Sequence, residues 1–501
     1  MFAHLRRYPL FCLILMIAGL AMLVPGLYAA RLHNTPVMQA FFSSSLLVVI
    51  LGAILGLSLM NRKPRISARS HLTTILITYT ILPAFLAIPF VALVPSITPA
   101  QGYFEMLSSL TTTGATIINA PQSIAAPLHL WRGFVAWSGG FMMLVIAFSI
   151  MEPMNLGGFE IRSLVTGAGL GDGSYGSSDP SDRIIKNVVK LAPIYALATF
   201  ALTMLLMMSG DRALTATIHA MSILSTSGIS PTDGIPGSGS GRIGEGFMAL
   251  FLLFALSHRI LQTLSGAMGT AWIRQDVELR LAFLVLVVVP LLLVSRHWIA
   301  APEISEESAA TFVRSLWGGF FTVLSFLTTT GFESADWQAA RIWSGLNSPG
   351  LILLALVTLG GGVATTAGGV KLLRLYALYR HGLREMERLV HPSSIGGAGM
   401  AARRFRREGA FIAWIFLMLF LVGIATVMLM LSSIGTSFED SMSFAIAAVT
   451  NTGPAAYVLD SSTQYSDLNY ASRAVLCVGM IFGRVEVLAL IALFNPNYWR
   501  R

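Results

Sequence analysis

The chain has 501 residues, of which 55% are hydrophobic and only 11% are charged, and its mean hydropathy is +0.72. Soluble globular proteins carry about a quarter charged residues, so this composition excludes that class. Apolar runs of about 20 residues recur, which is the length that a helix needs to cross a bilayer. The sequence therefore predicts an all-α polytopic membrane protein, because the strands of a membrane β-barrel would alternate over about ten residues instead.

Residues 1–69 are predicted to form two N-terminal transmembrane helices. Arg6 and Arg7 precede an apolar run that ends in small residues, as in a signal peptide. The run is longer than a usual signal core and a second spanning run, 37–60, follows at once, so an uncleaved anchor helix is favoured. Cys12 and Cys477, the two cysteines, lie in apolar runs and are interpreted as core residues, not as a disulfide or metal pair.

The net charge of +9 is distributed in a way that indicates a membrane topology and not a nucleic-acid partner. Lys and Arg concentrate in alternate connecting segments, and the intervening loops carry acidic residues instead. This positive-inside pattern places both termini in the cytoplasm. The densest basic segment runs from Lys371 to Arg407 and holds nine Lys and Arg residues.

Four glycine-centred motifs recur along the chain: SSLTTTGATI at 108–117, SILSTSGISP at 222–231, SFLTTTGFES at 325–334 and AAVTNTGPAA at 447–456. Their glycines are separated by 114, 103 and 122 residues. A long apolar helix precedes each motif, and these helices are predicted at 72–95, 184–208, 280–299 and 409–432. Between helix and motif lies a stretch too short to span a bilayer, at 103–111, 214–225, 313–327 and 438–449. A second long apolar helix follows each motif, so each unit reads as helix, re-entrant loop, helix.

The repeats divide the chain into six parts. These are the N-terminal helices 1–69, pore repeat 1 at 70–152, a cytoplasmic linker at 153–181, pore repeat 2 at 182–275, pore repeat 3 at 276–392, and a basic linker with pore repeat 4 at 393–501.

Irregular backbone at membrane depth is tolerated only where it is buried or lines a water-filled cavity. Four such loops around one axis would bring together four sets of backbone carbonyls, which can replace the hydration shell of a monovalent cation. Glycine permits the positive φ that such a loop needs, and Thr or Ser hydroxyls can bind the ion or brace the loop. The short helices would point their negative C-terminal ends at the pore, and Glu105, Glu439 and Asp440 lie near helix starts, where acids are favoured. The predicted filter residues are Thr112, Thr113, Gly114, Thr226, Ser227, Gly228, Thr329, Thr330, Gly331, Asn451, Thr452 and Gly453.

Three other interpretations compete with a filter. A single TTTG motif is often only a turn that ends a helix, although four copies in equivalent places argue against that reading. Secondary carriers are also built from broken helices, but usually with inverted repeats, whereas these repeats all run in the same direction. An enzyme has no support, because the nine histidines are scattered and no nucleophile–base set is present.

The motifs TTTG, STSG, TTTG and TNTG within four helix–loop–helix repeats resemble the TrkH/TrkG/KtrB superfamily of bacterial potassium transporters, over essentially the whole chain past residue 70. The two extra helices and the ending FNPNYWRR are similar to the TrkH-like branch. The resemblance implies potassium uptake across the inner membrane through a single-glycine filter, with potassium as the transported ligand and no organic cofactor. It also implies a homodimer and a cytoplasmic TrkA-like nucleotide-binding ring, which the basic segment could dock, although that segment could equally bind anionic lipids. The motif STSGIS departs from the family because a second glycine is missing.

Residues 358–371, TLGGGVATTAGGVK, interrupt the last helix of repeat 3. Five glycines in this stretch make a regular helix unfavourable, at about 1 kcal/mol each relative to Ala. The resemblance implies an intramembrane gating loop below the filter, with a helix-packing surface as the alternative. Its predicted gating residues are Gly360, Gly361, Gly362, Thr365, Thr366, Gly368 and Gly369.

Arg484 lies inside the last apolar run, where a charged residue is expensive and therefore a functional candidate. The resemblance suggests that it projects into the pore near the gating loop, as a positive barrier and a partner for loop carbonyls. The alternative is a structural pair with Glu486, but residues two apart on a helix do not face each other.

Overall fold

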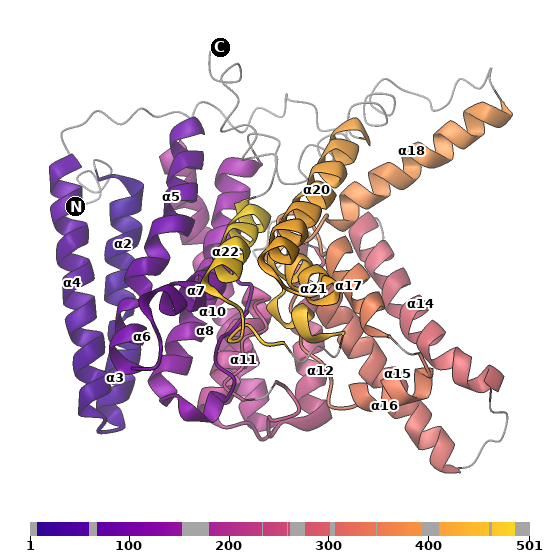
Figure 1. The fold of residues 1–501 in the computed structure, drawn as a ribbon, viewed down its shortest axis with the longest axis horizontal. Helices are drawn as coiled ribbons and strands as arrows, with labels where there is room; N and C mark the ends of the chain where they lie inside the picture. Colours follow the sequence, from indigo (N-terminus) through magenta and orange to yellow (C-terminus); the bar gives the residue numbers. More distant parts are fainter. Residues whose placement is uncertain are drawn as a thin grey trace.

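The computed structural model describes residues 8–59, 68–152, 180–232, 234–257, 259–260, 276–300, 306–346, 348–391, 410–459 and 463–485. Within these ranges the regular elements are helices (Figure 1). Seven helical segments are long and apolar enough to cross a membrane, namely Leu10–Arg31, Thr35–Leu59, Ser70–Leu93, Ala126–Met151, Asp182–Met208, Val277–Ser295 and Ala410–Ile434. The all-α membrane architecture predicted from composition is confirmed.

An antiparallel helical pair forms one flank of the molecule (Figure 1). It comprises α2 (Leu10–Ala21), α3 (Leu23–Arg31) and α4 (Thr35–Leu59). The pair packs closely because small residues face the partner helix, and Ser45 Oγ donates a hydrogen bond of 2.7 Å to the carbonyl of Gly19. This pair is the predicted two-helix unit.

Repeat 1 begins with α5 (Ala68–Leu86) and α6 (Ile88–Leu93), which together form one span. The short helix α7 (Pro99–Leu110) starts at a capping box, in which Thr98 and Gln101 each bond the backbone N–H of the other. The repeat ends with α8 (Ala126–Ile146), extended by the π-helical turn Ala147–Met151.

Repeat 2 contains α10 (Pro180–Met208), α11 (Ala213–Ser225) and α12 (Gly241–Leu252). After α12 the chain continues as the 3-10 turn Leu253–Ala255, and the carbonyl of Ala255 accepts a hydrogen bond of 3.0 Å from Gly362 N, in repeat 3. Residues 261–275, the end of the predicted repeat, lie outside the described residues.

Repeat 3 carries five helices, which are α14 (Val277–Ala300), α15 (Glu306–Leu327), α16 (Trp337–Ser344), α17 (Gly350–Leu359) and α18 (Leu372–Val390). α15 is longer than the predicted stretch 313–327, since it begins at an acidic segment that suits the positive N-terminal end of a helix. Residues 360–371 separate α17 from α18 and are not helical.

Repeat 4 contains α20 (Ala410–Ile434), α21 (Phe438–Val449), a 3-10 helix (Gly453–Tyr457) and α22 (Tyr470–Val485). Glu439 and Asp440 lie in the first turn of α21, as expected. The same expectation for Glu105 is wrong, because α7 begins at Pro99 and Glu105 is buried in its middle. An ion pair with Arg132, and not the helix dipole, compensates its charge.

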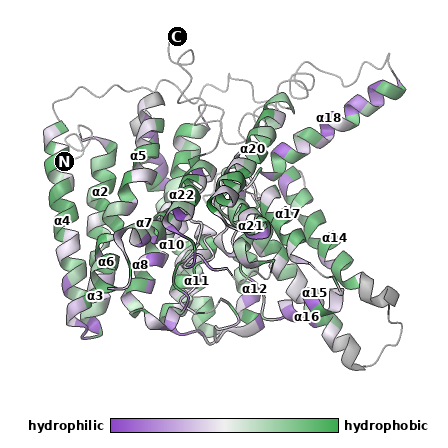
Figure 2. Cartoon of the chain, viewed as in Figure 1, coloured by the Kyte–Doolittle hydropathy of each residue, from purple (hydrophilic) through white to green (hydrophobic). Residues whose placement is uncertain are grey.

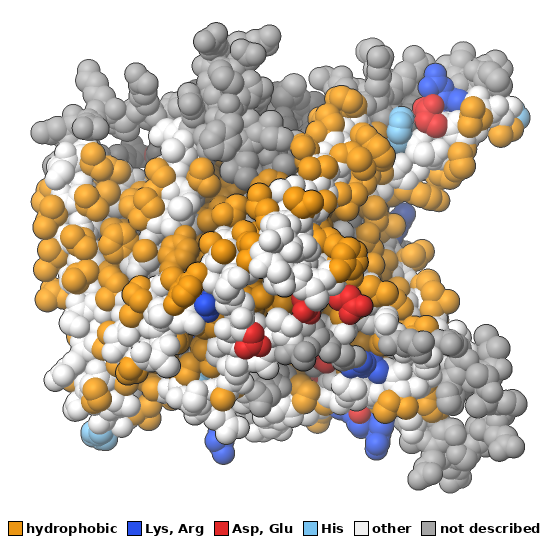
Figure 3. Space-filling model, viewed as in Figure 1, with side chains coloured by type: hydrophobic (Ala, Val, Ile, Leu, Met, Phe, Trp, Pro, Cys, Tyr) orange, Lys and Arg blue, Asp and Glu red, His pale blue; other side chains and the backbone are white. Residues whose placement is uncertain are grey.

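The four repeats run in the same direction (Figure 1). In each, the first helix descends from the upper side, the short helix returns only to the middle, and the final helix ascends. Apolar residues cover the long helices in Figure 2, and the lateral surface in Figure 3 is largely hydrophobic, with charged side chains gathered on α18 and towards the lower side. The ends of the four short helices therefore meet inside the molecule, at mid-depth.

The contact between α7 and α8 gives a stability prediction. A Cβ added at Gly139 of α8 would overlap the carbonyl of Leu110 at the end of α7, whereas one added at Gly246 of α12 would meet open space. We expect Gly139→Ala to lower the stability of the detergent-purified protein by about 1–3 kcal/mol. Gly246→Ala should be neutral or slightly stabilising, because Ala favours a helix over Gly by about 1 kcal/mol. Thermal unfolding of both variants measures the difference, and equal midpoints would contradict the packing.

Candidate functional site

The four glycine motifs form a closed ring of contacts. A Cβ placed on Gly114 would overlap the carbonyl of Ser227, and one on Gly228 would overlap the carbonyl of Thr330. In the same way, a Cβ on Gly331 would lie 3.1 Å from Thr452 Cγ2, in repeat 4. The ring closes at repeat 1, where Gly453 N donates a hydrogen bond of 2.5 Å to the carbonyl of Thr113. Repeats 1, 2, 3 and 4 thus follow one another around a common axis.

The same backbone turn ends all four short helices. In each repeat, the N–H of the residue before the motif glycine bonds to the carbonyl five positions earlier. The four bonds are Thr113 N to Ser108 O (2.8 Å), Ser227 N to Ser222 O (3.0 Å), Thr330 N to Ser325 O (2.8 Å) and Thr452 N to Ala447 O (2.8 Å). This bond is the 6→1 link of a Schellman motif, which terminates a helix with one left-handed residue. The motifs are therefore helix-ending turns and members of a ring at once.

The left-handed residue of this turn is not the glycine. It is the residue two positions earlier: Thr112 (φ 54°), Thr226 (φ 52°), Thr329 (φ 58°) and Asn451 (φ 56°). Positive φ is rare in a β-branched residue and costs about 1–3 kcal/mol, so the three threonines require support from their surroundings, whereas Asn adopts this conformation more readily. Gly114, Gly228 and Gly331 also have positive φ, at 73°, 65° and 81°, whereas Gly453 does not. The expected positive φ of the motif glycines thus holds in three repeats.

Hydroxyl groups brace each turn from within. The residue three positions before each glycine pairs with the residue one position before it, at Thr111–Thr113 (2.8 Å), Ser225–Ser227 (3.1 Å), Thr328–Thr330 (3.1 Å) and Thr450–Thr452 (3.4 Å). In Thr111 and Thr328, the hydroxyl also bonds a carbonyl of the last helical turn. The sequence left two roles open for the Thr and Ser hydroxyls, namely ion binding and bracing of the loop. The hydrogen bonds above are bracing contacts. The hydroxyls of Thr113, Ser227, Thr330 and Thr452 are thereby engaged within the turns.

The donor set suits a cation that is held weakly. Among the described residues, no group of three or more His, Cys, Asp or Glu side chains could hold a metal ion. The C-terminal ends of four helices point at the ring, and they carry partial negative charge. Neutral oxygens, together with the negative electrostatic field of the helix C-terminal ends, favour a monovalent cation. Such binding is weak enough for the ion both to enter and to leave.

Residues 360–371 pack directly against the ring. Gly368 N donates a hydrogen bond of 2.7 Å to Thr329 Oγ1, the hydroxyl of a left-handed turn residue. Thr366 Oγ1 donates to the carbonyl of Leu224 at 3.3 Å, in repeat 2. A Cβ on Gly368 would overlap the carbonyl of Thr450, in repeat 4. The segment thus contacts the turns of three repeats.

Arg484 is buried, with 3% of its surface exposed, and meets this segment. Its Nη1 donates a hydrogen bond of 2.7 Å to the carbonyl of Thr366, while Nε and Nη2 have no hydrogen-bond partner within the described part of the chain. Arg484 also lines a small cavity together with Gly368, Gly369 and Asn451. Glu486, the alternative partner considered for Arg484, lies outside the described residues.

Lys371 and Arg374 were assigned to a cytoplasmic basic surface, and that assignment is wrong. Lys371 is 4% exposed, has a φ of 83°, and its Nζ donates to the carbonyl of Ala367. Arg374 is fully buried, with its guanidinium carbon 3.6 Å from the ring centroid of Phe416. Both belong to the buried surroundings of residues 360–371, because the chain turns inward there before α18 leaves the body. The sequence did carry one signal for the burial of Lys371: this basic residue comes directly after GGV, within an apolar stretch.

Two buried acids support the site and were not predicted to do so. Glu278 Oε1 accepts a hydrogen bond of 2.8 Å from Val363 N and so holds the segment 360–371. Glu105 accepts hydrogen bonds of 3.0 Å from Ile117 N and Thr116 Oγ1 and lies 2.7 Å from Arg132 Nε. Neither role follows from spacing, because the partners come from other elements.

The comparisons with known proteins agree with this geometry. Residues 249–501 match the model of the TrkH family, described as cation transport proteins. The chain belongs to this family. It is 28% identical to the Trk system potassium uptake protein TrkH of Salmonella typhimurium, over 97% of each chain. It is 27% identical to TrkI, a Trk system potassium uptake protein of Halomonas elongata, over 92% of this chain and 90% of the relative.

The fold also matches a solved structure. The crystal structure of the potassium transporter TrkH from Vibrio parahaemolyticus superposes with a TM-score of 0.79 and 25% identity, over 98% of each chain. The family membership predicted from the four motifs is confirmed. As a member of a family of cation transport proteins, the chain is a multi-pass membrane protein that moves ions and is not an enzyme.

The buried Glu105–Arg132 pair yields a second prediction. Glu105→Gln leaves an unpaired arginine in the core, and Arg132→Met leaves an unpaired carboxylate, so each should cost about 3–5 kcal/mol. The double variant removes both charges while an amide oxygen remains for Ile117 N. We expect it to unfold at a higher temperature than either single variant. A double variant that is less stable than both singles would show that the pair stabilises by more than charge compensation.

Proposed function

We propose that this protein takes up potassium across the bacterial inner membrane through one pore, with the twelve predicted filter residues around its axis. The observation that carries the proposal is the closed ring, in which the turns of four repeats meet in order at mid-depth. The names of the matched relatives, which are potassium uptake proteins and a potassium transporter, support potassium as the ion. Four repeats in one direction favour a channel-like pore over a carrier with inverted repeats.

Selectivity in this proposal comes from the backbone. Potassium sheds its water as carbonyls of the four turns take the place of the hydration shell. The left-handed residues Thr112, Thr226, Thr329 and Asn451 end the helices, so that the carbonyls that follow are free of the helical ladder. The hydroxyl pairs keep the turns in place, and the helix ends supply a field that favours a cation.

Residues 360–371 and Arg484 form the proposed gate. The segment lies between the ring and the side from which α18 emerges, and it is held there by hydrogen bonds from Gly368 to Thr329 and from Arg484 to Thr366. A buried guanidinium repels a passing cation much more strongly than it would in water, because the effective dielectric constant is low. Opening requires both hydrogen bonds to break.

Regulation is proposed to come from the cytoplasm, where we place both termini and the polar face of α18. Arg380, Arg384 and Arg388 follow one another along this helix, and Arg388 is exposed. A homodimer with a TrkA-like nucleotide-binding ring on this face would join the ring to the gate through α18. The remaining arginines of the basic segment, Arg403, Arg404, Arg406 and Arg407, lie outside the described residues.

Complementation tests the proposed function. The chain is expressed in a bacterium that lacks potassium uptake systems and grows on limiting potassium, and the fluxes of rubidium and sodium are measured alongside growth. Restored growth with rubidium uptake is the expected result. Correctly inserted protein that restores neither would contradict potassium uptake.

Gly331→Asp is expected to impair the preference for potassium over sodium. The new side chain would crowd Pro454 and Thr452, strain a φ of 81°, and place a carboxylate where a cation must be released. Gly345→Asp is the matched control, since Gly345 lies in the same repeat, has a φ of 56°, and faces open space. Unchanged relative permeability in folded Gly331→Asp would remove Gly331 from the filter.

Arg484→Ala is expected to raise rubidium flux and to leave ion preference largely unchanged. It removes a positive charge and the hydrogen bond to Thr366, but it leaves the turns intact. Arg484→Lys keeps the charge without the guanidinium geometry, so its flux should lie between those of the wild type and Arg484→Ala. If Arg484→Ala is folded but conducts nothing, the residue is a structural or activating element and the gate lies elsewhere.

A further inference from the structure

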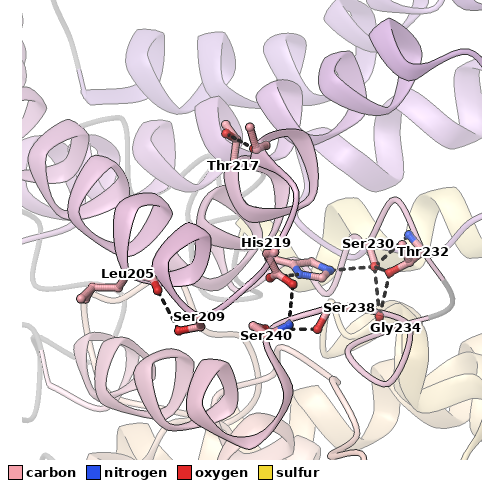
Figure 4. Close-up of polar contacts among 11 residues, drawn as sticks. Leu205, Ser209, Thr217, His219, Ser230, Thr232, Gly234, Ser238 and Ser240 are labelled. Atoms are coloured by element: carbon pink, nitrogen blue, oxygen red, sulfur yellow. Dashed lines mark hydrogen bonds and ion pairs between the residues drawn. The ribbon is translucent and has the colours of Figure 1, made fainter.

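One position behind the ring ties each short helix to the chain that leaves the turn. It stands nine residues before the motif glycine and is occupied by Glu105, His219, Thr322 and Phe444. In repeats 1 and 3, an N–H three positions past the glycine donates to it, as Ile117 N to Glu105 Oε2 (3.0 Å) and Ser334 N to Thr322 Oγ1 (3.2 Å). In repeat 2, Nε2 of His219 lies 2.8 Å from Oγ of Ser230, two positions past the glycine (Figure 4). These braces behind the ring leave the carbonyl of the motif glycine untouched.

Repeat 4 differs because its brace reaches the glycine itself. The ring of Phe444 packs edge-on against Tyr465, with centroids 4.8 Å apart, and the Tyr465 hydroxyl donates a hydrogen bond of 3.0 Å to the carbonyl of Gly453. Within the described part of the chain, no hydrogen bond reaches the carbonyls of Gly114, Gly228 and Gly331. Gly453 is therefore the motif glycine whose carbonyl is held by a side chain.

The backbone of repeat 4 also departs from the other three after the turn. Gly453 lacks the positive φ of the other motif glycines and begins the 3-10 helix Gly453–Tyr457. Pro454, the next residue, lies beside two other repeats. A Cβ on Gly228 would stand 3.0 Å from Pro454 Cγ, and one on Gly331 would stand 3.0 Å from both Cβ and Cγ of Pro454. Repeat 4 thus brings a bonded carbonyl and a proline ring to the ring of turns, to which the other repeats bring unbonded glycine carbonyls.

Tyr465 is fixed on several sides. It is fully buried, and its ring contacts Phe104 of α7, with centroids 5.8 Å apart. Next to it in the chain, Ser466 Oγ accepts a hydrogen bond of 2.9 Å from Asn119 Nδ2, in repeat 1. Together with Phe444 of α21, these contacts hold the hydroxyl between the short helices of repeats 1 and 4.

We infer that Tyr465 is a positioning residue of the filter, whose hydrogen bond to Gly453 sets the preference of the ring for potassium over sodium. The inference rests on the proposed function, in which carbonyls of the four turns surround the ion. A carbonyl that is held cannot move inward to surround the smaller sodium ion. A carbonyl that shares its electron density with a hydroxyl also presents a weaker field, which favours the larger and less strongly hydrated potassium. Both effects of the hydrogen bond act in the same direction.

The test is cation uptake into proteoliposomes that contain the purified full-length protein, with rubidium and sodium measured as separate fluxes. Tyr465→Phe keeps the aromatic packing but removes the hydrogen bond to Gly453. We expect the ratio of rubidium to sodium uptake to fall about two- to tenfold, which is the range that the net contribution of one hydrogen bond gives. Rubidium uptake itself should continue, because the turn of repeat 4 and its contact with repeat 1 remain.

Tyr457→Phe is the matched control. Tyr457 lies in the same aromatic cluster, with its ring centroid 5.6 Å from that of Tyr465, but the hydroxyl that bonds Gly453 belongs to Tyr465. The uptake ratio of this control should equal that of the wild type. Thermal unfolding of both variants is measured in parallel, since a merely structural role of Tyr465 would lower the midpoint and leave the ratio unchanged.

Phe444→Leu changes the support of Tyr465 and keeps its hydroxyl. Without the ring that packs against it, Tyr465 holds the Gly453 carbonyl less firmly. The uptake ratio should therefore fall measurably, but by less than in Tyr465→Phe. This variant decides the question if Tyr465→Phe does not fold.

The outcomes separate the inference from the proposed function. An unchanged ratio in folded Tyr465→Phe, or in Phe444→Leu where Tyr465→Phe does not fold, would overturn the inference alone. So would an equal loss of preference in Tyr457→Phe, because the hydrogen bond to Gly453 would then not be the cause. Equal uptake of the two cations by the wild type would leave Tyr465 no preference to set. Reconstituted wild-type protein that takes up neither cation would overturn the proposed function and, with it, the inference.

Discussion

The left-handed turn that ends each short helix is the constraint on which the rest of the structure depends. A hydrogen bond from the residue before the motif glycine to the carbonyl five positions earlier closes the helix, and the chain must then leave its axis. The glycine that follows lies so close to the next repeat that no side chain fits there without overlap in the cases of Gly114 and Gly228. Thr and Ser are common in these motifs because their hydroxyls can bond the same turn. The ring, the gate contact and the braces behind the ring are all built around this turn.

The four repeats share this turn but surround it differently, and the differences separate their roles. In repeat 3, the left-handed Thr329 accepts a hydrogen bond from Gly368, so a change in residues 360–371 acts directly on a turn of the ring. In repeat 4, Asn451 bonds both Thr113 of repeat 1 and the carbonyl of Met480 in α22. Backbone symmetry is thus kept at the ring, while the side chains around it make each repeat distinct.

Buried charges of both signs lie on each side of the ring. Behind the turns, Glu105 is paired with Arg132, and Asp211 lies beside His219. Around residues 360–371, the bases Lys371, Arg374 and Arg484 gather, and the carboxylate of Glu278 accepts a hydrogen bond from Val363 N. Arg484 bonds the carbonyl of Thr366 in this segment, so it is the base that stands at the gate of the proposed pore.

The sequence by itself determined the membrane class, the four repeats and the identity of the ring motifs. These follow from the length of apolar runs and from the spacing of Gly114, Gly228, Gly331 and Gly453, which are local properties of a chain in a bilayer. Only the tertiary structure decided that three threonines and Asn451, and not the glycines, take the left-handed position at the helix end, because neighbouring backbone must support a conformation that is unfavourable for threonine. It also moved Lys371 and Arg374 from a surface into the core, and it joined His219 to Asp211 and Ser230. Such pairings depend on which elements meet across the molecule, and periodicity along the chain carries no record of that.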